Sequence, residues 1–452
     1  MTPLWGRASP SRILVSMPIR PATLAAFAAL LLPFASLAQT PTSDAILYPS
    51  PIGKQAETDE YTRYELLSPD TASFKIHYEV TAITEGAKVF YNPIRKGSIA
   101  SDESVYDAMT GQPLHFEVVS GADARRDPLL PDADPASDYI KVTLARPVPH
   151  AGQARILIVK TYKDPKSYYT DGDAIVFDRP LGIPRDQVVL PSGYEITSLS
   201  VPSQILTEPD GRIAISFLHA GSGEAPLVLR AVKDAQTGPA AQPAPLTDAR
   251  SWESPFTGET ERARLSQRAS QNRDIVYFLQ RPETHAFSLY HDYTESRPGI
   301  NGYANVVRTG SSASHPSAYV LDTGEQLTAK EMSGADMEAS GINTGENVDP
   351  KDSVVVIPFP AIQQGQSLRL RIAETYTAPT SYRLEGDTLV FDRSLGRARN
   401  AVVLPSGWYV TASATPATVS QLPDGRIRLT YWDDRPEPVD VLIKAKRRVT
   451  AH

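Results

Sequence analysis

The feature that most constrains this chain is an internal repeat. The segment Thr161–Tyr168 recurs as Thr375–Tyr382, at an offset of 375 − 161 = 214 residues, with Thr, Tyr, Pro, Ser and Tyr in the same order. Further upstream the offset is 213, as between Tyr64 and Tyr277. One net single-residue shift between two long copies is the mark of a duplicated domain, so both halves must build the same fold.

The repeat divides the chain into segments. The copies predict two domains, at residues 61–233 and 273–452, and residues 39–60 form an N-terminal extension before the first. Residues 234–272 contain a Pro- and Ala-rich stretch followed by a polar one, which is typical of a linker. Because each copy is complete, we expect each half to fold alone.

Within each copy the hydrophobic pattern has a period of two. Apolar and polar residues alternate over Phe74–Val80, and Ile156–Val159 is a continuous apolar run, typical of a strand buried on both faces. Pro-Asp-Gly turns at 209–211 and 423–425 each precede an alternating segment. Together with 39 prolines, these patterns predict an all-β fold class: two tandem antiparallel β-sandwich domains related by internal duplication.

The first 38 residues have the layout of a secretory signal peptide. Three arginines are followed by the apolar run Ala22–Leu32, and Ser36–Ala38 offers small residues for cleavage. The run is too short for a confident membrane span, and no later stretch reaches that length. We therefore expect a periplasmic or secreted protein without a transmembrane segment after cleavage. Both Met1 and Met17 are candidate starts.

Composition removes several classes of function. The chain has no Cys, which excludes disulfide scaffolds, thiol nucleophiles and Cys-ligated metals. Its formal net charge is −7, whereas nucleic-acid binders usually carry a concentrated basic face. We therefore expect no nucleic-acid partner.

Known catalytic motifs are absent from the sequence, and the histidines do not repeat. His77 corresponds to Tyr290, and His291 corresponds to Tyr78, so neither copy keeps the other's histidine. A metal ligand or general base inherited by duplication should appear twice. The sequence therefore predicts no catalytic residue and no metal-ligating residue.

A charged motif is retained in both copies. Its residues are Asp178, Arg179 and Arg185 in the first copy and Asp392, Arg393 and Arg399 in the second. An Asp between two arginines could hold a carboxylate or a sugar. We favour a buried ion-pair network, in which case replacing Asp178 with Ala should cost about 3–5 kcal/mol.

Aromatic residues are retained as well. We interpret Tyr162 and Tyr376 as core residues, since they continue a long alternating strand. Nearby tyrosines and Trp could either belong to the core or stack on a sugar ring. The candidate ligand-binding residues are Tyr168, Tyr169, Arg185, Tyr382, Arg399 and Trp408.

Acidic residues cluster where the two copies diverge. Five Asp residues lie between Asp123 and Asp138, and a second group lies between Asp336 and Asp352. Hard oxygen ligands could hold Ca²⁺, but the EF-hand pattern is missing. We expect solvated loops and no cofactor, with loop-bound Ca²⁺ as the alternative.

Several segments resemble a known family. Tyr64-Glu-Leu-Leu-Ser-Pro-Asp, Phe74-Lys-Ile-His-Tyr-Glu-Val and the Thr110-Gly111 turn resemble the β-domain that precedes the catalytic domain in zinc aminopeptidases. The resemblance covers one copy and implies a β-sandwich fold. The zinc motif of those enzymes is missing, so the resemblance carries over no catalytic residue.

Two functions remain open. The first is an exported, non-catalytic tandem β-sandwich that binds a glycan, a peptide or an envelope protein. The second is a secreted hydrolase or lyase that acts on a polysaccharide or peptide polymer. The absence of a His or carboxylate constellation shared by both copies favours the first.

Overall fold

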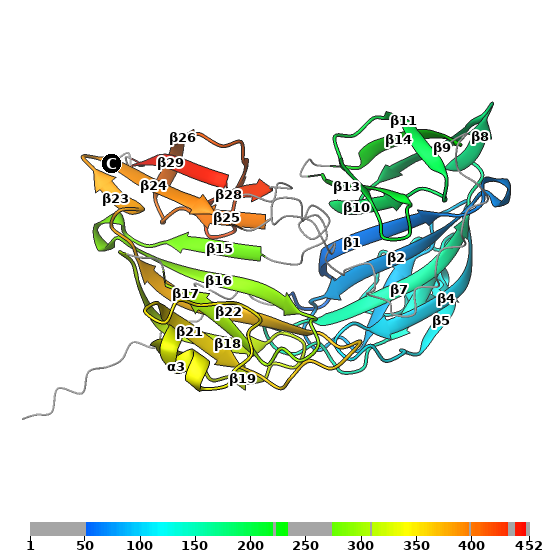
Figure 1. Cartoon of the computed structure of the whole chain (residues 1–452). Coiled ribbons are helices and arrows are strands. Elements are labelled where there is room, and N and C mark those ends of the chain that lie inside the picture. Colours follow the sequence, from blue (N-terminus) through cyan, green and yellow to red (C-terminus); the bar gives the residue numbers. More distant parts are fainter. Residues whose placement is uncertain are drawn as a thin grey trace, which may run out of the picture. The chain divides into compact units, whose positions relative to one another are not determined.

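The structure, a computed structural model, describes residues 51–219, 223–233, 274–307, 310–396, 399–432 and 439–448. Over these residues the chain is almost entirely β, in two similar halves, which confirms the predicted fold class (Figure 1). The predicted signal peptide and the linker at 234–272 lie outside the described residues. Residues 51–60 of the predicted N-terminal extension are described, and the first strand begins among them, at Glu57.

The described residues of the first repeat form sheets of seven, four and three strands, ordered β12-β13-β10-β1-β2-β7-β4, β11-β14-β9-β8 and β3-β6-β5. The strands are β1 (Glu57–Leu66), β2 (Ser73–Ala82), β3 (Val89–Pro93), β4 (Ile99–Asp107), β5 (Phe116–Ser120), β6 (Asp138–Thr143), β7 (Ala154–Lys163), β8 (Tyr168–Asp171), β9 (Ala174–Leu181), β10 (Arg185–Val189), β11 (Tyr194–Leu199), β12 (Gln204–Thr207), β13 (Ile213–Leu218) and β14 (Ala225–Lys233).

The second repeat forms the same three sheets over its described residues, with one short strand added to the large one. Their orders are β19-β18-β22-β16-β15-β25-β28-β27, β23-β24-β29-β26 and β17-β21-β20. The strands are β15 (Asp274–Leu279), β16 (Ala286–Glu295), β17 (Gly302–Val306), β18 (Ser312–Val320), β19 (Gln326–Leu327), β20 (Lys330–Ser333), β21 (Ser353–Pro358), β22 (Leu368–Thr377), β23 (Tyr382–Glu385), β24 (Thr388–Leu395), β25 (Arg399–Val403), β26 (Trp408–Ser413), β27 (Thr418–Gln421), β28 (Ile427–Trp432) and β29 (Val439–Arg447).

The strand pairing differs from the prediction at one place in each repeat. Neighbouring strands pair antiparallel except β1 with β10, where Thr62 lies opposite Asp186, and β15 with β25, where Asp274 lies opposite Arg399. A parallel pair needs a long connection, and the segments between these strands carry most of the other strands of each repeat. The alternation pattern alone does not distinguish the two kinds of pairing.

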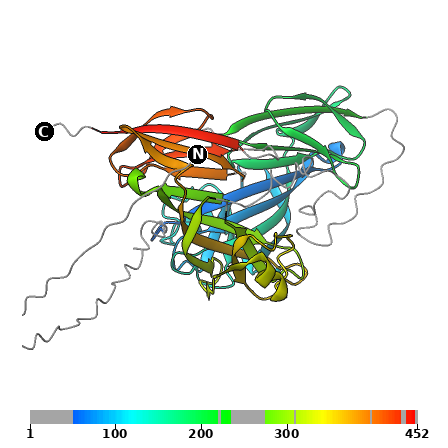
Figure 2. The same cartoon turned by 60° about the vertical axis from the view of Figure 1, so that its left-hand side comes forward.

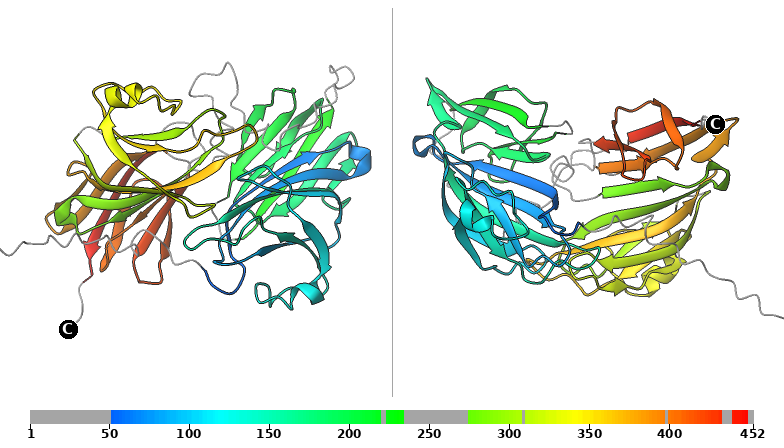
Figure 3. Two further views of the ribbon diagram at one scale, coloured as in Figure 1. Left: turned by 90° about the horizontal axis from the view of Figure 1, so that it is seen from below. Right: turned by 180° about the vertical axis from the view of Figure 1, so that it is seen from behind.

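The two smaller sheets of each repeat cover the same face of the large sheet (Figures 2 and 3). In the first repeat, Phe74 of β2 packs edge-on against Phe177 of β9, with ring centroids 5.3 Å apart. Phe90 of β3 and Ile140 of β6 belong to the same buried cluster. In the second repeat, the side chains under the four-stranded sheet and those under the three-stranded sheet form separate clusters.

Short helices fall where the acidic clusters were predicted. They are α1 (Gly121–Ala124) and α3 (Gly334–Ala339), and two further turns are the 3₁₀ helices η2 (Pro69–Thr71) and η5 (Pro282–Thr284). At α1, the Ser120 hydroxyl accepts a hydrogen bond from the Asp123 backbone N–H. The second helix repeats this cap with Ser333 and Asp336. Each serine hydroxyl also donates to the carboxylate of the same aspartate, so the serine and the aspartate together form the cap that starts the helix. The described helices are all too short to cross a bilayer.

Candidate functional site

The retained charged motif of the first repeat does not form the predicted network. Asp178 is exposed, and the carboxylate that pairs with Arg179 is that of Asp164, 3.0 Å from the Arg179 guanidinium. Arg179 and Arg185 lie on opposite faces of the large sheet. Arg179 lies over Phe74, on the inner face that the two smaller sheets cover, and Arg185 lies over Tyr61, on the other face. The prediction of one Asp178–Arg179–Arg185 cluster is therefore wrong.

The second repeat corrects the same prediction. Asp392 is exposed, and Arg393 is buried over the rings of Tyr277, Phe287 and Tyr376, with distances of 5.3–5.9 Å to their centroids. Arg399 lies in β25, beside Asp274 of β15. These residues are close in the sequence, which is why they were predicted to form one cluster. Consecutive residues of a strand, however, point their side chains to opposite faces of the sheet.

The candidate ligand-binding aromatics lie mainly in the core. Tyr168 and Tyr382 are completely buried, and their hydroxyls donate to the backbone carbonyls of Leu67 and Gln280. Trp408 is buried in the second core, whereas Tyr169 is half-buried. None of the six predicted ligand-binding residues lines either of the pockets described below. A binding role for them stays a prediction.

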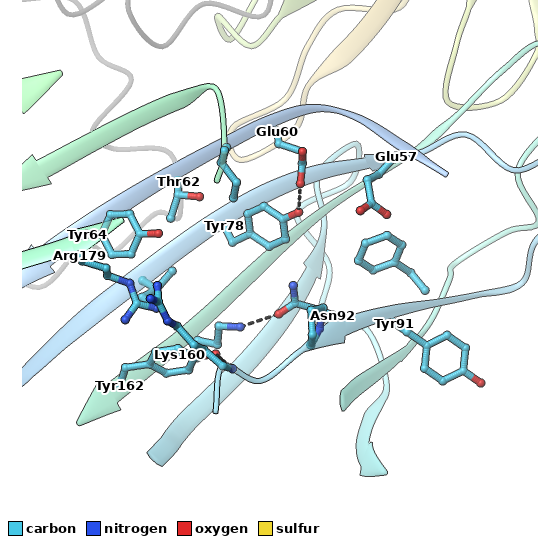
Figure 4. Close-up of a pocket in the computed structure, with 15 residues that line it drawn as sticks. Glu57, Glu60, Thr62, Tyr64, Tyr78, Tyr91, Asn92, Lys160, Tyr162 and Arg179 are labelled. Carbon is cyan, nitrogen blue, oxygen red and sulfur yellow. Dashed lines mark hydrogen bonds between the residues drawn. The ribbon is translucent and has the colours of Figure 1, made fainter. Parts of the chain in front are cut away.

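A pocket of about 270 Å³ opens on the inner face of the large sheet in the first repeat. Its floor comes from β1, β2 and β7, and its rim from β3 and β9, so it lies where the two smaller sheets meet (Figure 4). Its lining residues are Glu57, Glu60, Thr62, Tyr64, Ile76, Tyr78, Phe90, Tyr91, Asn92, Pro93, Arg95, Lys160, Tyr162, Arg179 and Ile183.

A buried lysine dominates one part of this pocket. Lys160 is 4% exposed, and its ammonium group donates to the side-chain carbonyl of Asn92. Its nitrogen lies 5.0 Å from the centre of the Tyr162 ring. No described carboxylate pairs with Lys160, whereas its neighbour Arg179 has Asp164. A buried cation without a counter-ion is costly, so this arrangement favours an anionic ligand.

Acidic residues occupy another part of the same pocket. Glu60 accepts a hydrogen bond from the Tyr78 hydroxyl, and Glu57 lies near it, across the Tyr78 ring from Lys160 and Arg179 (Figure 4). Glu57 is exposed at the mouth. The pocket therefore offers positive and negative groups separated by an aromatic ring.

The second repeat has a smaller pocket of about 120 Å³ at the equivalent place. It is lined by Ile275, Tyr277, Leu289, His291, Tyr303, Asn305, Val306, Glu374, Tyr376, Arg393 and Gly396. Four positions keep their residue type in both pockets. They pair Tyr64 with Tyr277, Asn92 with Asn305, Tyr162 with Tyr376, and Arg179 with Arg393. The duplication thus preserved a pocket as well as a fold.

One central position has reversed its charge. Glu374 is equivalent to Lys160, since 374 − 160 = 214, and both lie near the middle of their pockets on β22 and β7. The side-chain N–H of Asn305 donates to Glu374, whereas the side-chain carbonyl of Asn92 accepts from Lys160. The asparagine presents the group that each partner needs.

Both central groups have shifted pKa values. Burial, with a smaller contribution from the charge of Arg179, lowers the pKa of Lys160 to about 7, although the charge of Glu103 opposes the fall. Burial raises the pKa of Glu374 to about 7, although Arg393 and the Asn305 hydrogen bond oppose the rise. Deeper in the first repeat, burial also raises the pKa of Asp186 well above its usual range. Perturbed groups in a pocket mark a candidate functional site.

The sequence contained a signal for these pockets that the motif analysis did not use. Lys160 directly follows the apolar run Ile156–Val159, and Glu374 replaces it in the other copy. Opposite charges at one position of a strand buried on both faces would have singled out the pair. The swapped residues Tyr78 and His291 also line the two pockets. Among the described residues, no group of three His, Asp or Glu side chains could hold a metal ion.

Comparisons with known proteins give similarity over part of the chain. No known family and no curated protein matches it. An M1 zinc metallopeptidase from Deinococcus radiodurans is 13% identical over 42% of this chain and 45% of its own, with a TM-score of 0.27. An aminopeptidase N family protein from Idiomarina loihiensis is 12% identical, with coverages of 38% and 29% and a TM-score of 0.24.

A third structure, a candidate nutrient-binding protein from Legionella pneumophila, is 12% identical over 41% of this chain and 69% of its own, with a TM-score of 0.25. This chain thus resembles M1 zinc aminopeptidases over part of its length, as its sequence motifs indicated. The similarity spans under half the length of the metallopeptidase from Deinococcus.

Proposed function

We propose that this protein is an exported, non-catalytic binding protein whose first repeat holds a short peptide through its terminal carboxylate. The observation that carries the proposal is the buried ammonium group of Lys160, which forms no ion pair with a described carboxylate. A carboxylate in the pocket would restore the charge balance and form a charge-assisted hydrogen bond.

The remainder of the pocket fits one residue of a peptide. Its volume of about 270 Å³ lies just below the usual range for drug-sized ligands. The rings of Tyr78 and Tyr162 offer apolar surface for a side chain. Glu57 and Glu60 supply acceptors for the backbone N–H or ammonium groups that a peptide carries and a neutral glycan does not.

Calorimetry on the full chain tests the proposal. The probes are the dipeptide Ala-Phe and its C-terminal amide, which differ in the carboxylate alone. We expect the acid to bind at least tenfold more tightly than the amide at pH 6.5, because Lys160 is then mostly protonated. Its affinity should fall as the pH rises through 7, where Lys160 loses its charge.

Two variants locate the site. Lys160→Met removes the charge and keeps a long, unbranched side chain, so it should abolish the difference in affinity between the acid and the amide. Lys163→Met, an exposed lysine on the same strand, is the matched control and should bind as the parent does. Equal binding of acid and amide, or unchanged binding by Lys160→Met, would contradict the proposal. Release of free Phe would favour the hydrolase alternative.

Export belongs to the same proposal and rests on residues 1–38. Cleavage after Ala38 would give a mature chain that begins with Gln39. Cell fractionation and N-terminal sequencing of the full-length product check this. A cytoplasmic protein that retains residues 1–38 would remove export from the proposal.

A further inference from the structure

The second pocket contains a buried carboxylate that the protein itself satisfies only in part. Glu374 is 2% exposed, and Asn305 donates to one of its oxygens, Oε1. The other oxygen, Oε2, is buried and has no hydrogen-bond partner among the described residues. An unsatisfied buried acceptor costs free energy unless a ligand donates to it.

We propose that the second repeat holds a separate binding site for a small primary ammonium group, with Glu374 as its counter-ion. The site goes beyond the peptide site of the first repeat and does not depend on it, since the two pockets share no residue. An ammonium group supplies three N–H donors, so it can satisfy Oε2 and still donate to a nearby hydroxyl.

The shape of the pocket sets the size of the ligand. It has a volume of about 120 Å³, room for roughly four water-sized groups. It lies between two of the hydrophobic clusters of this repeat, with Tyr277 and Tyr376 from one and Tyr303 from the other. Aromatic rings around a carboxylate suit a cation, because ring faces attract positive charge.

Other charged and titratable groups face the same pocket. They are Arg393 from β24, His291 from β16, Tyr303 from β17, Tyr277 from β15 and Tyr376 from β22. Arg393 forms no ion pair with Glu374 within the described residues; it lies among three rings, as Arg179 does in the first repeat. Arg393 is therefore the rival anchor, and a ligand held by it would carry a carboxylate.

Ligand-observed NMR titration of the full chain tests the proposal with four small probes. Ethylammonium represents a free amine, glycinamide represents a peptide N-terminus, ethanol is the neutral control, and acetate is the probe for Arg393. We expect ethylammonium, glycinamide or both to bind at pH 8, which also distinguishes the two sources of the ammonium group. Glu374→Gln should weaken binding of the cation at least tenfold, and Glu338→Gln, at an exposed position, should leave its affinity unchanged.

A charge reversal separates this site from the first pocket. Glu374→Lys gives the second pocket the residue type that the first pocket has at this position. It should abolish ethylammonium binding and create binding of acetate. Lys160→Met should not remove this acetate binding. Failure of Ala-Phe to bind would count against the peptide site alone, because that ligand occupies the other repeat.

The parent protein offers a readout that needs no variant. Ethylammonium stays protonated up to about pH 10, so its affinity should rise about tenfold between pH 6 and 8 as Glu374 ionises. A rise that persists in Glu374→Gln would arise from His291 and would overturn the proposal. If the second repeat of the parent protein bound acetate and neither of the amines, Arg393 would be the anchor of the pocket and the proposal would be overturned.

Discussion

At the scale of single residues, the two pocket arginines are held in different ways. Arg179 and Arg393 each lie over three equivalent rings, but only the first repeat supplies Asp164, since Ala378 takes its place in the second. Burial acts to raise the pKa of Asp164, yet hydrogen bonds from Ser167 and the charge of Arg179 outweigh it and lower the pKa.

This difference gives a prediction for the charged motif. Asp164→Ala leaves a buried guanidinium unpaired, so it should lower the free energy of unfolding by about 3–5 kcal/mol, measured by denaturant unfolding of the full chain at pH 7. Because the folded pKa is lowered, this stabilisation is present above pH 3.8 and is lost as the pH falls further. Asp178→Ala is the control and should change stability by less than about 0.5 kcal/mol. A larger loss for Asp178→Ala would restore the network predicted from the sequence.

At the scale of elements, the start of each short helix leaves no room for a side chain. A Cβ on Gly121 would lie 1.9 Å from the backbone oxygen of Asp134, and one on Gly334 would lie 2.1 Å from that of Asp349. The positions are equivalent, since 334 − 121 = 213. Both clashes involve backbone, so the loop after each helix would have to move.

We therefore expect Gly121→Ala to destabilise the protein by about 1–3 kcal/mol, the usual effect of overpacking. Gly182→Ala is the matched control, because its nearest neighbour is a flexible side chain at 3.7 Å, and its stability should be nearly unchanged. Thermal unfolding of both variants provides the measurement. Equal melting temperatures would show that the loop between α1 and β6 adjusts freely.

The sequence predicted elements better than it predicted their partners. Alternation over Phe74–Val80 identified the inner strands, and duplication identified two similar sandwiches. The sequence did not predict the parallel β1–β10 pair, because an alternation with a period of two does not depend on whether the strand pairs parallel or antiparallel. It also missed Asp164 as the partner of Arg179, because a loop at the end of β7 and a strand position on β9 meet only in the folded chain.

At the scale of the whole molecule, the two repeats share buried polar contacts. Arg155 of the first repeat donates to both carboxylate oxygens of Asp322 of the second, at 2.7 and 2.9 Å, and both side chains are buried. The Ser367 hydroxyl donates to the carbonyl of Ala108. When each half is expressed alone, these groups would face water rather than a partner, so the contact is compatible with the prediction that each half folds by itself.

A double-mutant cycle measures how strongly this contact couples the repeats. Asp322→Leu and Arg155→Met each leave one buried charge unpaired, so each should cost about 3–5 kcal/mol in the full chain, whereas the double variant should recover most of that loss. Arg230→Met, in an exposed pair with Asp171, is the control and should change little. Calorimetry adds a second readout, because weaker coupling should split one unfolding transition into two. Additive losses in the double variant would show that the two side chains do not interact.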